Sequence, residues 1–184
     1  MAREFTKQDL FYSLILNFVY FAKMQHVIRL LRKEDNPEIA RIIRSVLTEF
    51  NANKPGTVYF DPTTDDLYTL FAAHNSEYWI LELDGKIVGG SGVYPTENLP
   101  DGCCELVKLY LLPEARGKSY GKLLIETCFG SAKKFGYKQV YLETMPELKM
   151  AVGLYERCGF EYLKGPLGNS GHFGCDLWML KILI

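Results

Sequence analysis

Residues 104–122 read CELVKLYLLPEARGKSYGK and combine a strand, a short polar loop and the start of a helix. The strand is predicted over residues 104–112, and the helix that follows the loop is predicted over residues 121–135. Strict alternation along the strand predicts two faces: Glu105, Val107, Leu109 and Leu111 on one, and Leu106, Lys108 and Tyr110 on the other.

The loop between this strand and this helix has the composition of an anion-binding turn. Glycines let the chain curl so that successive N–H groups point to one centre, and the new helix adds unpaired N–H groups and the positive end of its dipole. Basic side chains at Arg116, Lys118 and Lys122 add charge. The sequence therefore predicts a cradle for a pyrophosphate. An ordinary strand-to-helix turn with solvated basic residues is the alternative, and neither the P-loop nor the dinucleotide-binding glycine pattern is present.

The rest of the chain continues the alternation of strands and helices. Asp84-Gly85 predicts a tight hairpin turn between two strands. The further strands are expected over 26–31, 78–83, 86–94, 139–144, 160–163 and 175–183, and the further helices over 36–50, 64–73 and 148–158. This order predicts an α/β (α+β) fold, in which a mixed sheet carries helices on its faces.

Composition limits the classes of function. The 184 residues contain 48% hydrophobic and 23% charged side chains, as expected for one globular domain. Because 21 Lys and Arg balance 22 Asp and Glu, no global basic field predicts nucleic-acid binding. Five cysteines without a C-x-x-C pair indicate reduced thiols in a cytoplasmic protein, and three scattered histidines predict no metal site.

The first 23 residues are predicted to form a separate amphipathic helical extension to a domain of residues 24–184. Apolar residues between Phe11 and Ala22 fall on one helical face, but the stretch is too short to span a bilayer. We expect this helix to pack on protein rather than membrane, either on its own domain or across a homodimer. Met24 is an alternative start, and on that interpretation the segment is a dispensable extension.

Two motifs resemble the GNAT superfamily of N-acetyltransferases. Residues 109–122 are similar to its motif A, with pattern R/Q-x-x-G-x-G/A, in which Arg116 and Gly121 match the first and last positions. Residues 151–160, AVGLYERCGF, are similar to the motif B stretch A-x-x-L-Y-x-x-x-G-F. The resemblance covers residues 26–183. It implies a mostly antiparallel sheet with one splayed parallel strand pair and helices on both faces.

The resemblance also implies acetyl-CoA as co-substrate, without a metal. The pantetheine is expected to lie between strands 104–112 and 139–144 and to contact Leu109, Tyr110 and Leu111. The pyrophosphate contacts are assigned to the loop, namely Arg116, Gly117, Lys118, Ser119, Tyr120, Gly121 and Lys122. Two positions depart from the family: Ser119 stands where glycine is usual, a change tolerable at negative φ, and Leu148 stands where asparagine is frequent.

Transfer of an acetyl group to an amine needs a base for the amine, an acid for the departing thiolate and a donor to the carbonyl oxygen. By resemblance, Glu105 is the candidate base, Tyr155 the candidate acid and the backbone N–H of Leu109 the carbonyl donor. A structural carboxylate and a core aromatic are the alternatives for the two side chains. Cys103 and Cys104 are poor candidates for a nucleophile because no histidine is near them in the sequence.

The acceptor is predicted to be a primary amine of a small molecule or amino-acid-like compound. Helix 36–50 and loops 51–63 and 165–174 are expected to form the acceptor walls. Five side chains are expected to line the pocket: Tyr59, Phe60, Tyr94, His172 and Trp178. Two alternatives stay open, namely acetylation of a protein N-terminus or lysine, and an acyl-CoA sensor without turnover.

Overall fold

The computed structural model describes residues 25–183, which form a seven-stranded sheet in the order β1-β2-β3-β4-β5-β7-β6. The strands are β1 (His26–Leu30), β2 (Glu77–Leu83), β3 (Lys86–Tyr94), β4 (Cys103–Leu111), β5 (Gln139–Thr144), β6 (Glu161–Tyr162) and β7 (Leu177–Ile182). Neighbouring strands are antiparallel, except that β4 and β5 are parallel. The predicted mixed, mostly antiparallel sheet is confirmed. The helix predicted within residues 1–23 lies outside the described residues.

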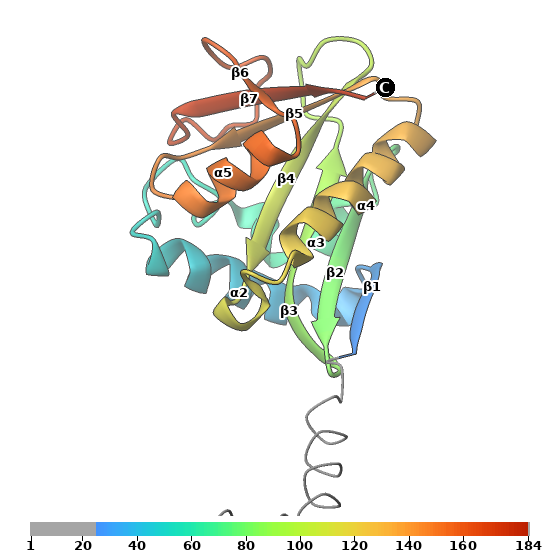
Figure 1. Cartoon of the computed structure of the whole chain (residues 1–184), viewed down its shortest axis with the longest axis vertical. Helices are drawn as coiled ribbons and strands as arrows, with labels where there is room; N and C mark the ends of the chain where they lie inside the picture. Colours follow the sequence, from blue (N-terminus) through green and yellow to red (C-terminus); the bar gives the residue numbers. More distant parts are fainter. Residues whose placement is uncertain (1–24, 184) are drawn as a thin grey trace, which may run out of the picture.

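Helices cover both faces of the sheet (Figure 1). Helix α2 (Asn36–Glu49) packs on one face, whereas α4 (Tyr120–Lys134) and α5 (Lys149–Arg157) pack on the other. The short elements are η1 (Lys33–Asp35), η2 (Pro62–Asp65), α3 (Leu67–Leu70) and η3 (Pro113–Ala115). Helix α2 begins as its sequence predicts, with Pro37 in the first turn, where the missing N–H costs nothing.

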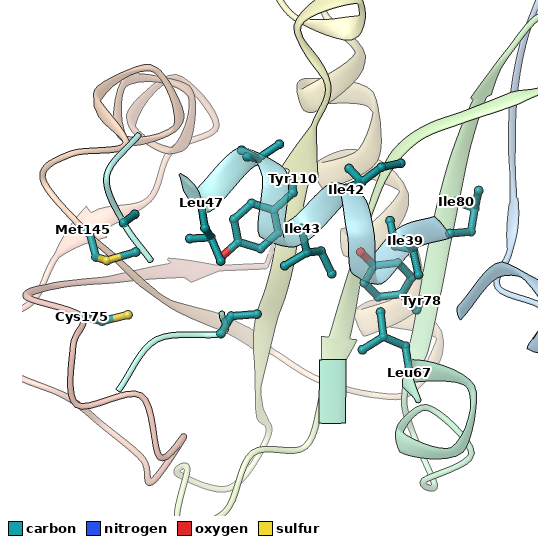
Figure 2. Close-up of a cluster of buried hydrophobic side chains, with 13 residues drawn as sticks. Ile39, Ile42, Ile43, Leu47, Leu67, Tyr78, Ile80, Tyr110, Met145 and Cys175 are labelled. Carbon is teal, nitrogen blue, oxygen red and sulfur yellow. The ribbon is translucent and has the colours of Figure 1, made fainter. Parts of the chain in front are cut away.

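The apolar residues of α2 recur at helical spacing and therefore share one buried face, which forms the core on this side of the sheet (Figure 2). Ile39, Ile43 and Leu47 are fully buried on one side of this helix. They pack against Tyr78 of β2 and Tyr110 of β4. Each fully buried aliphatic side chain contributes about 1.5–3 kcal/mol to folding. This packing therefore fixes α2 against β4, the strand that carries the predicted site residues.

One predicted helix is much shorter in the structure. The helix expected over 64–73 is replaced by the 3-10 turn η2 and the single turn α3. Asp66 separates them with a non-helical backbone (φ −138°, ψ 65°), and its carboxylate accepts a hydrogen bond from the N–H of Thr69 at 3.2 Å. The Asn36 side chain also donates to Asp66 at 2.7 Å. Asp66 thus starts a new turn instead of continuing the helix.

The parallel strands β4 and β5 stay paired over only three residues each. Cys103, Cys104 and Glu105 pair with Gln139, Val140 and Tyr141 in turn. Beyond Glu105, β4 remains paired with β3 and β5 with β7. The two strands therefore separate in the middle of the sheet (Figure 1), as the splayed pair predicts.

Candidate functional site

Two cavities meet where β4 separates from β5. One has a volume of about 320 Å³ and lies beside the loop before α4; we call it the donor groove. The other has a volume of about 520 Å³ and lies under the loops around residues 56–63 and 169–175; we call it the acceptor cavity. Leu109, Tyr110 and Leu148 line both of them. A molecule bound in the donor groove would therefore reach one bound in the acceptor cavity at this point of β4.

Most residues predicted to hold the co-substrate line the donor groove. Eight of them do: Leu109, Tyr110, Leu111, Arg116, Gly117, Ser119, Gly121 and Lys122. Lys118 and Tyr120 are outside the lining; Lys118 is exposed, and the Tyr120 ring lies 5.3 Å from the ring of His26. The groove is lined by three basic side chains, Arg116, Lys122 and Arg157, and by no acidic residue of the described part of the chain.

The loop at the mouth of the donor groove needs two left-handed residues. Gly117 has φ +69° and Ser119, directly before α4, has φ +64°. The negative φ at which serine in place of glycine would be tolerated is not found at Ser119, because the turn into α4 uses the conformation that glycine adopts freely. A non-glycine residue there costs on the order of 1 kcal/mol. The loop keeps its shape in spite of Ser119, since α4 and η3 hold it on both sides.

Arg116 connects this loop to α2. Its Nη1 and Nη2 donate to the Glu49 carboxylate at 2.6 and 2.8 Å, and its Nε donates to the Leu111 carbonyl at 2.8 Å. The guanidinium also lies 5.1 Å from the centre of the Phe50 ring. Arg116 was predicted as a direct pyrophosphate ligand. Its contacts show that it also fixes the loop against the end of α2.

A β-bulge in β4 changes which side chains share a face. Gly90 pairs with Tyr110 and Gly92 with Val107, so Lys108 and Leu109 together face the single residue Ser91. Lys108 has φ +53° at this point. Strict alternation along β4 was therefore a wrong expectation. Leu106 and Leu109 contribute to the same hydrophobic cluster on the α4 side, while Tyr110 packs on the α2 side.

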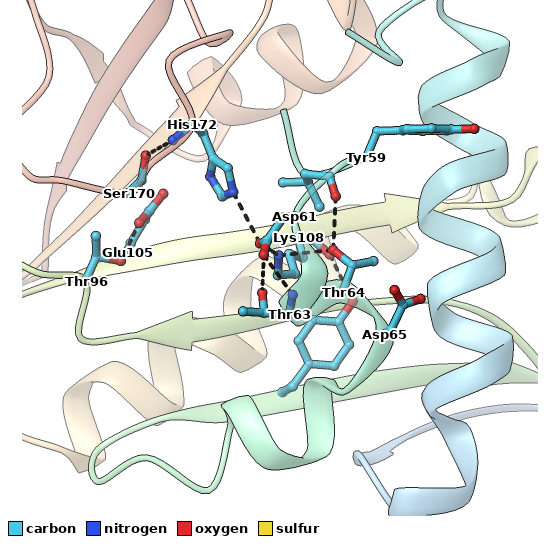
Figure 3. A network of polar contacts seen from close by, with 12 residues as sticks. Tyr59, Asp61, Thr63, Thr64, Asp65, Thr96, Glu105, Lys108, Ser170 and His172 are labelled. Carbon is cyan, nitrogen blue, oxygen red and sulfur yellow. Dashed lines mark hydrogen bonds and ion pairs between the residues drawn. The ribbon is translucent and has the colours of Figure 1, made fainter. Parts of the chain in front are cut away.

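Glu105 lies in the acceptor cavity just before the strands separate. It is 4% exposed, and the hydroxyl of Thr96 donates a hydrogen bond to its carboxylate (Figure 3). Burial raises the pKa of Glu105 to about 7; the Thr96 hydrogen bond opposes this rise, and the charge of Glu143 adds to it. A carboxyl with this pKa can accept a proton near neutral pH, as a general base must.

Tyr155 comes from α5 and lines the acceptor cavity. Its ring packs against Phe160 with 5.9 Å between ring centres, and the residue is 6% exposed. Burial raises the pKa of Tyr155, so the hydroxyl keeps its proton at neutral pH. No hydrogen bond within residues 25–183 occupies this hydroxyl. Glu105 and Tyr155 thus present a proton acceptor and a proton donor to one cavity.

A polar network on the other wall was not predicted from the sequence (Figure 3). The Lys108 ammonium lies 2.7 Å from Asp61 Oδ2, and His172 Nε2 lies 3.4 Å from the same oxygen. Burial acts to raise the pKa of Asp61, but the His172 hydrogen bond and the Lys108 charge outweigh it and hold that pKa well below its usual range. Burial lowers the pKa of Lys108, which the Asp61 charge opposes. The one available signal was Lys108, which stands among apolar residues from Leu106 to Leu111 of the strand.

The predicted acceptor walls are partly correct. Phe60, Tyr94 and His172 line the acceptor cavity, as do the loops expected there. Tyr59 and Trp178 do not: Tyr59 packs against the α2 core, and Trp178 pairs with Glu143 across β5 and β7. The prediction that α2 forms an acceptor wall is also wrong, because Val46 of this helix lines the donor groove instead.

The buried cysteines are poor nucleophiles. Burial raises the pKa of Cys103 to about 11 and that of Cys175 to about 12, so both thiols stay protonated near neutral pH. Within residues 25–183, no three His, Cys, Asp or Glu side chains are grouped to hold a metal ion. Over the same residues, no helix has the length and apolarity needed to cross a membrane.

Comparison with known proteins identifies the family. The Acetyltransferase (GNAT) family matches residues 39–160. The Escherichia coli protein named uncharacterized N-acetyltransferase YjgM is 42% identical over 164 residues, which cover 88% of this chain and 98% of that protein. Human N-acetyltransferase 8 is 30% identical over 119 residues, 61% of this chain and 52% of that protein. The chain therefore belongs to the GNAT family of acetyltransferases, whose acetyl donor is acetyl-CoA.

Solved structures agree on the fold. An acetyltransferase of the GNAT family from Staphylococcus aureus Mu50 superposes with a TM-score of 0.78 at 19% identity, over 87% of this chain and 100% of that chain. The PaiA N-acetyltransferase of Thermoplasma acidophilum, solved with coenzyme A, gives 0.67 at 21% identity, over 86% and 99%. At such identities the likeness shows the fold alone.

The donor groove fits a coenzyme A thioester on its own geometry. Positive φ at Gly117 and Ser119 curls the loop before the N-terminus of α4, a 15-residue helix whose first N–H groups are free to bind an anion. Gly121 lets α4 approach α5, because a Cβ there would lie 2.8 Å from the Leu154 side chain. The groove therefore combines a basic, N–H-rich end with an apolar path toward the acceptor cavity.

Proposed function

We propose that the protein transfers the acetyl group of acetyl-CoA to a primary amine of a small molecule, with Glu105 as base and Tyr155 as acid. The observation that carries this proposal is the junction of the two cavities at Leu109, Tyr110 and Leu148. The acceptor cavity holds both Glu105 and Tyr155. A donor and an acceptor bound on either side of the junction would meet beside both groups.

Each residue has a defined task in this reaction. Acetyl-CoA, when bound, supplies an activated acyl carbon on a thiol leaving group. Glu105 takes a proton from the acceptor ammonium, so that the neutral amine can form the new C–N bond. The backbone N–H of Leu109 donates to the carbonyl oxygen as charge develops there, and the hydroxyl of Tyr155 gives a proton to the sulfur as the C–S bond breaks. The nitrogen loses its second proton as the amide forms, and this proton restores the Tyr155 hydroxyl, while the proton taken by Glu105 passes to solvent. The products are the acetylated amine and coenzyme A.

The walls of the acceptor cavity favour a small molecule over a protein. The loops around residues 56 and 174 are joined by a hydrogen bond from Gly174 N–H to the Gly56 carbonyl at 2.8 Å. His172 and Asp61 approach each other from these same two loops. A cavity of about 520 Å³ bounded in this way matches the size of small-molecule sites, which range over roughly 300–1,000 Å³.

A panel assay tests the proposal. Release of free coenzyme A from acetyl-CoA is measured with small primary amines, with a lysine-containing peptide and with a peptide that has a free N-terminus. We expect turnover with small amines and loss of that turnover in Glu105→Gln. Faster turnover with either peptide would favour a protein acceptor. Tight acetyl-CoA binding without turnover on any amine would favour a sensor.

A further inference from the structure

Among the described residues, no unpaired lysine or arginine lines the acceptor cavity, so none is available to a substrate carboxylate. Among residues 25–183, its lining includes one lysine, Lys108, and no arginine. The Lys108 side chain is 3% exposed, and its ammonium lies 2.7 Å from Asp61 Oδ2 and 3.5 Å from Thr64 Oγ1. His172 approaches the same Asp61 oxygen at 3.4 Å. Lys108 and His172 of the cavity are therefore both directed at Asp61 instead of at a ligand.

Negative charge, in contrast, is available in the same cavity. Glu97, Glu105 and Glu143 line it, and none of the three takes part in an ion pair among the described residues. Glu143 is held by hydrogen bonds from the hydroxyls of Tyr141 at 2.8 Å and Ser170 at 2.6 Å. Such a cavity attracts the ammonium group of an acceptor and repels an acceptor that also carries a carboxylate, because placing like charges together is costly.

Two exposed aromatic rings stand at the same cavity. Phe60 is 59% exposed and Phe173 is 83% exposed, and both line the cavity. The Phe173 ring lies directly over Gly56, where a Cβ would meet its carbons at 2.5–2.7 Å. Large apolar side chains left in water beside a cavity are typical of a surface that an apolar ligand group covers.

From these observations we infer the acceptor class: a primary amine that carries an apolar or aromatic group and no carboxylate. Its ammonium is directed to Glu105, and its apolar group covers Phe60 and Phe173. This inference rests on the proposed function and narrows it, since it excludes the amino-acid-like acceptors that the sequence left open. Lys108 determines this specificity indirectly, because its pairing with Asp61 removes the charge that an acceptor carboxylate would need.

Matched substrate pairs test the inference. Phenethylamine and phenylalanine differ only by a carboxylate, as do tyramine and tyrosine. For both pairs we expect kcat/KM with the amine to exceed that with the amino acid by about 30-fold or more, on the scale of a mispaired polar group in a specific site. Equal or faster turnover of the amino acids would overturn the inference but leave the proposed function intact. If acetyl-CoA binds normally but none of the tested amines is acetylated, both the inference and the proposed function are overturned.

A pair of variants tests the aromatic contribution. Phe173→Ala should lower kcat/KM for phenethylamine by about fivefold to tenfold, and that for ethanolamine by less than about twofold, since loss of buried apolar area affects only the apolar amine. Tyr162→Ala is the matched control: Tyr162 is 52% exposed on β6 and lies outside the cavity lining. Unchanged phenethylamine kinetics in Phe173→Ala, or an equal loss in Tyr162→Ala, would contradict a role for this ring.

Discussion

The donor groove and the acceptor cavity share one strand but differ in charge and in origin. The donor groove is lined by Arg116, Lys122 and Arg157 without a carboxylate, and most of it comes from residues 109–122 and α5. The acceptor cavity is lined by four carboxylates, at Asp61, Glu97, Glu105 and Glu143, and by segments far apart in the chain. The fold thus places a groove with basic lining and a cavity with acidic lining on either side of the opening between β4 and β5.

Replacement of Glu105, the proposed base in the acceptor cavity, is expected to have the largest effect. Glu105→Gln should lower kcat/KM at pH 8 by about 10²-fold to 10³-fold, as expected for loss of a general base. The dissociation constant for acetyl-CoA should change by less than about twofold, because the donor groove is untouched. Steady-state kinetics and calorimetry measure the two quantities. An equal loss of acetyl-CoA affinity would show that the two sites are not separate.

The same variant has a second, opposite effect on stability. Because burial raises the pKa of Glu105 from 4.5 to about 7, the folded state binds more protons than the unfolded state between these values, and folding stability falls as pH rises through them. At pH 8, the free energy of unfolding of Glu105→Gln should therefore exceed that of the wild type by about 3 kcal/mol, since each pKa unit corresponds to about 1.4 kcal/mol. At pH 4 this difference should vanish. Denaturant titrations at both pH values check it.

Tyr155→Phe tests the junction between the two regions. The ring and its packing on Phe160 remain, and only the hydroxyl is lost. We expect kcat to fall about 10²-fold, within the range of general acid catalysis, while acetyl-CoA binding stays nearly intact. Near-wild-type kcat in this variant would mean that water or another group protonates the thiolate.

Arg116→Ala addresses the donor side alone. We expect the acetyl-CoA dissociation constant to rise by about tenfold or more, the scale of about 1.5–3 kcal/mol for a charged hydrogen bond. Glu49→Gln is the informative control, since it weakens the ion pair that holds the guanidinium against α2. An equal loss in Glu49→Gln would assign the effect of Arg116 to loop positioning. Unchanged affinity in Arg116→Ala would exclude Arg116 from the donor site.

Ser119→Gly should have the smallest effect. It relieves the left-handed conformation at φ +64° and should raise the free energy of unfolding by about 1 kcal/mol or less. Gly117→Ser is the matched control, because it places the same side chain at φ +69° in the same loop and should destabilise the protein. Thermal unfolding of both variants measures these changes. A loss of stability in Ser119→Gly would show that the serine side chain itself supports the loop.

The part of the donor groove that was predicted from the sequence comes from one contiguous segment. Strand, loop and helix follow each other within residues 104–135, so local signals such as Gly117 and Gly121 predict an anion site there. The sign of φ at Ser119 could not be read from the serine itself, and the glycine that is usual at this position in the family was the one signal for a left-handed residue. The register after Val107 was missed because one extra residue at Lys108 reverses every later side chain.

The acceptor cavity could be only partly predicted because its contacts join residues far apart in the sequence. Asp61 meets Lys108 across 47 positions and His172 across 111. No local pattern encodes such pairings, although a lysine within an apolar strand signals a buried partner. The wrong assignments of Tyr59, Trp178 and α2 to this cavity have the same origin. Loop paths decide which aromatic residues face a ligand, and those paths depend on packing across the whole domain.

The pH dependence of kcat/KM for a small primary amine tests most directly the claim that a buried Glu105 serves an acceptor site separate from the donor groove. For the wild type, kcat/KM should rise with pH through an apparent pKa near 7, as Glu105 ionises. In Glu105→Gln that inflection should disappear, while the pH dependence of acetyl-CoA binding stays unchanged. An inflection near 7 that persists in Glu105→Gln would contradict the account.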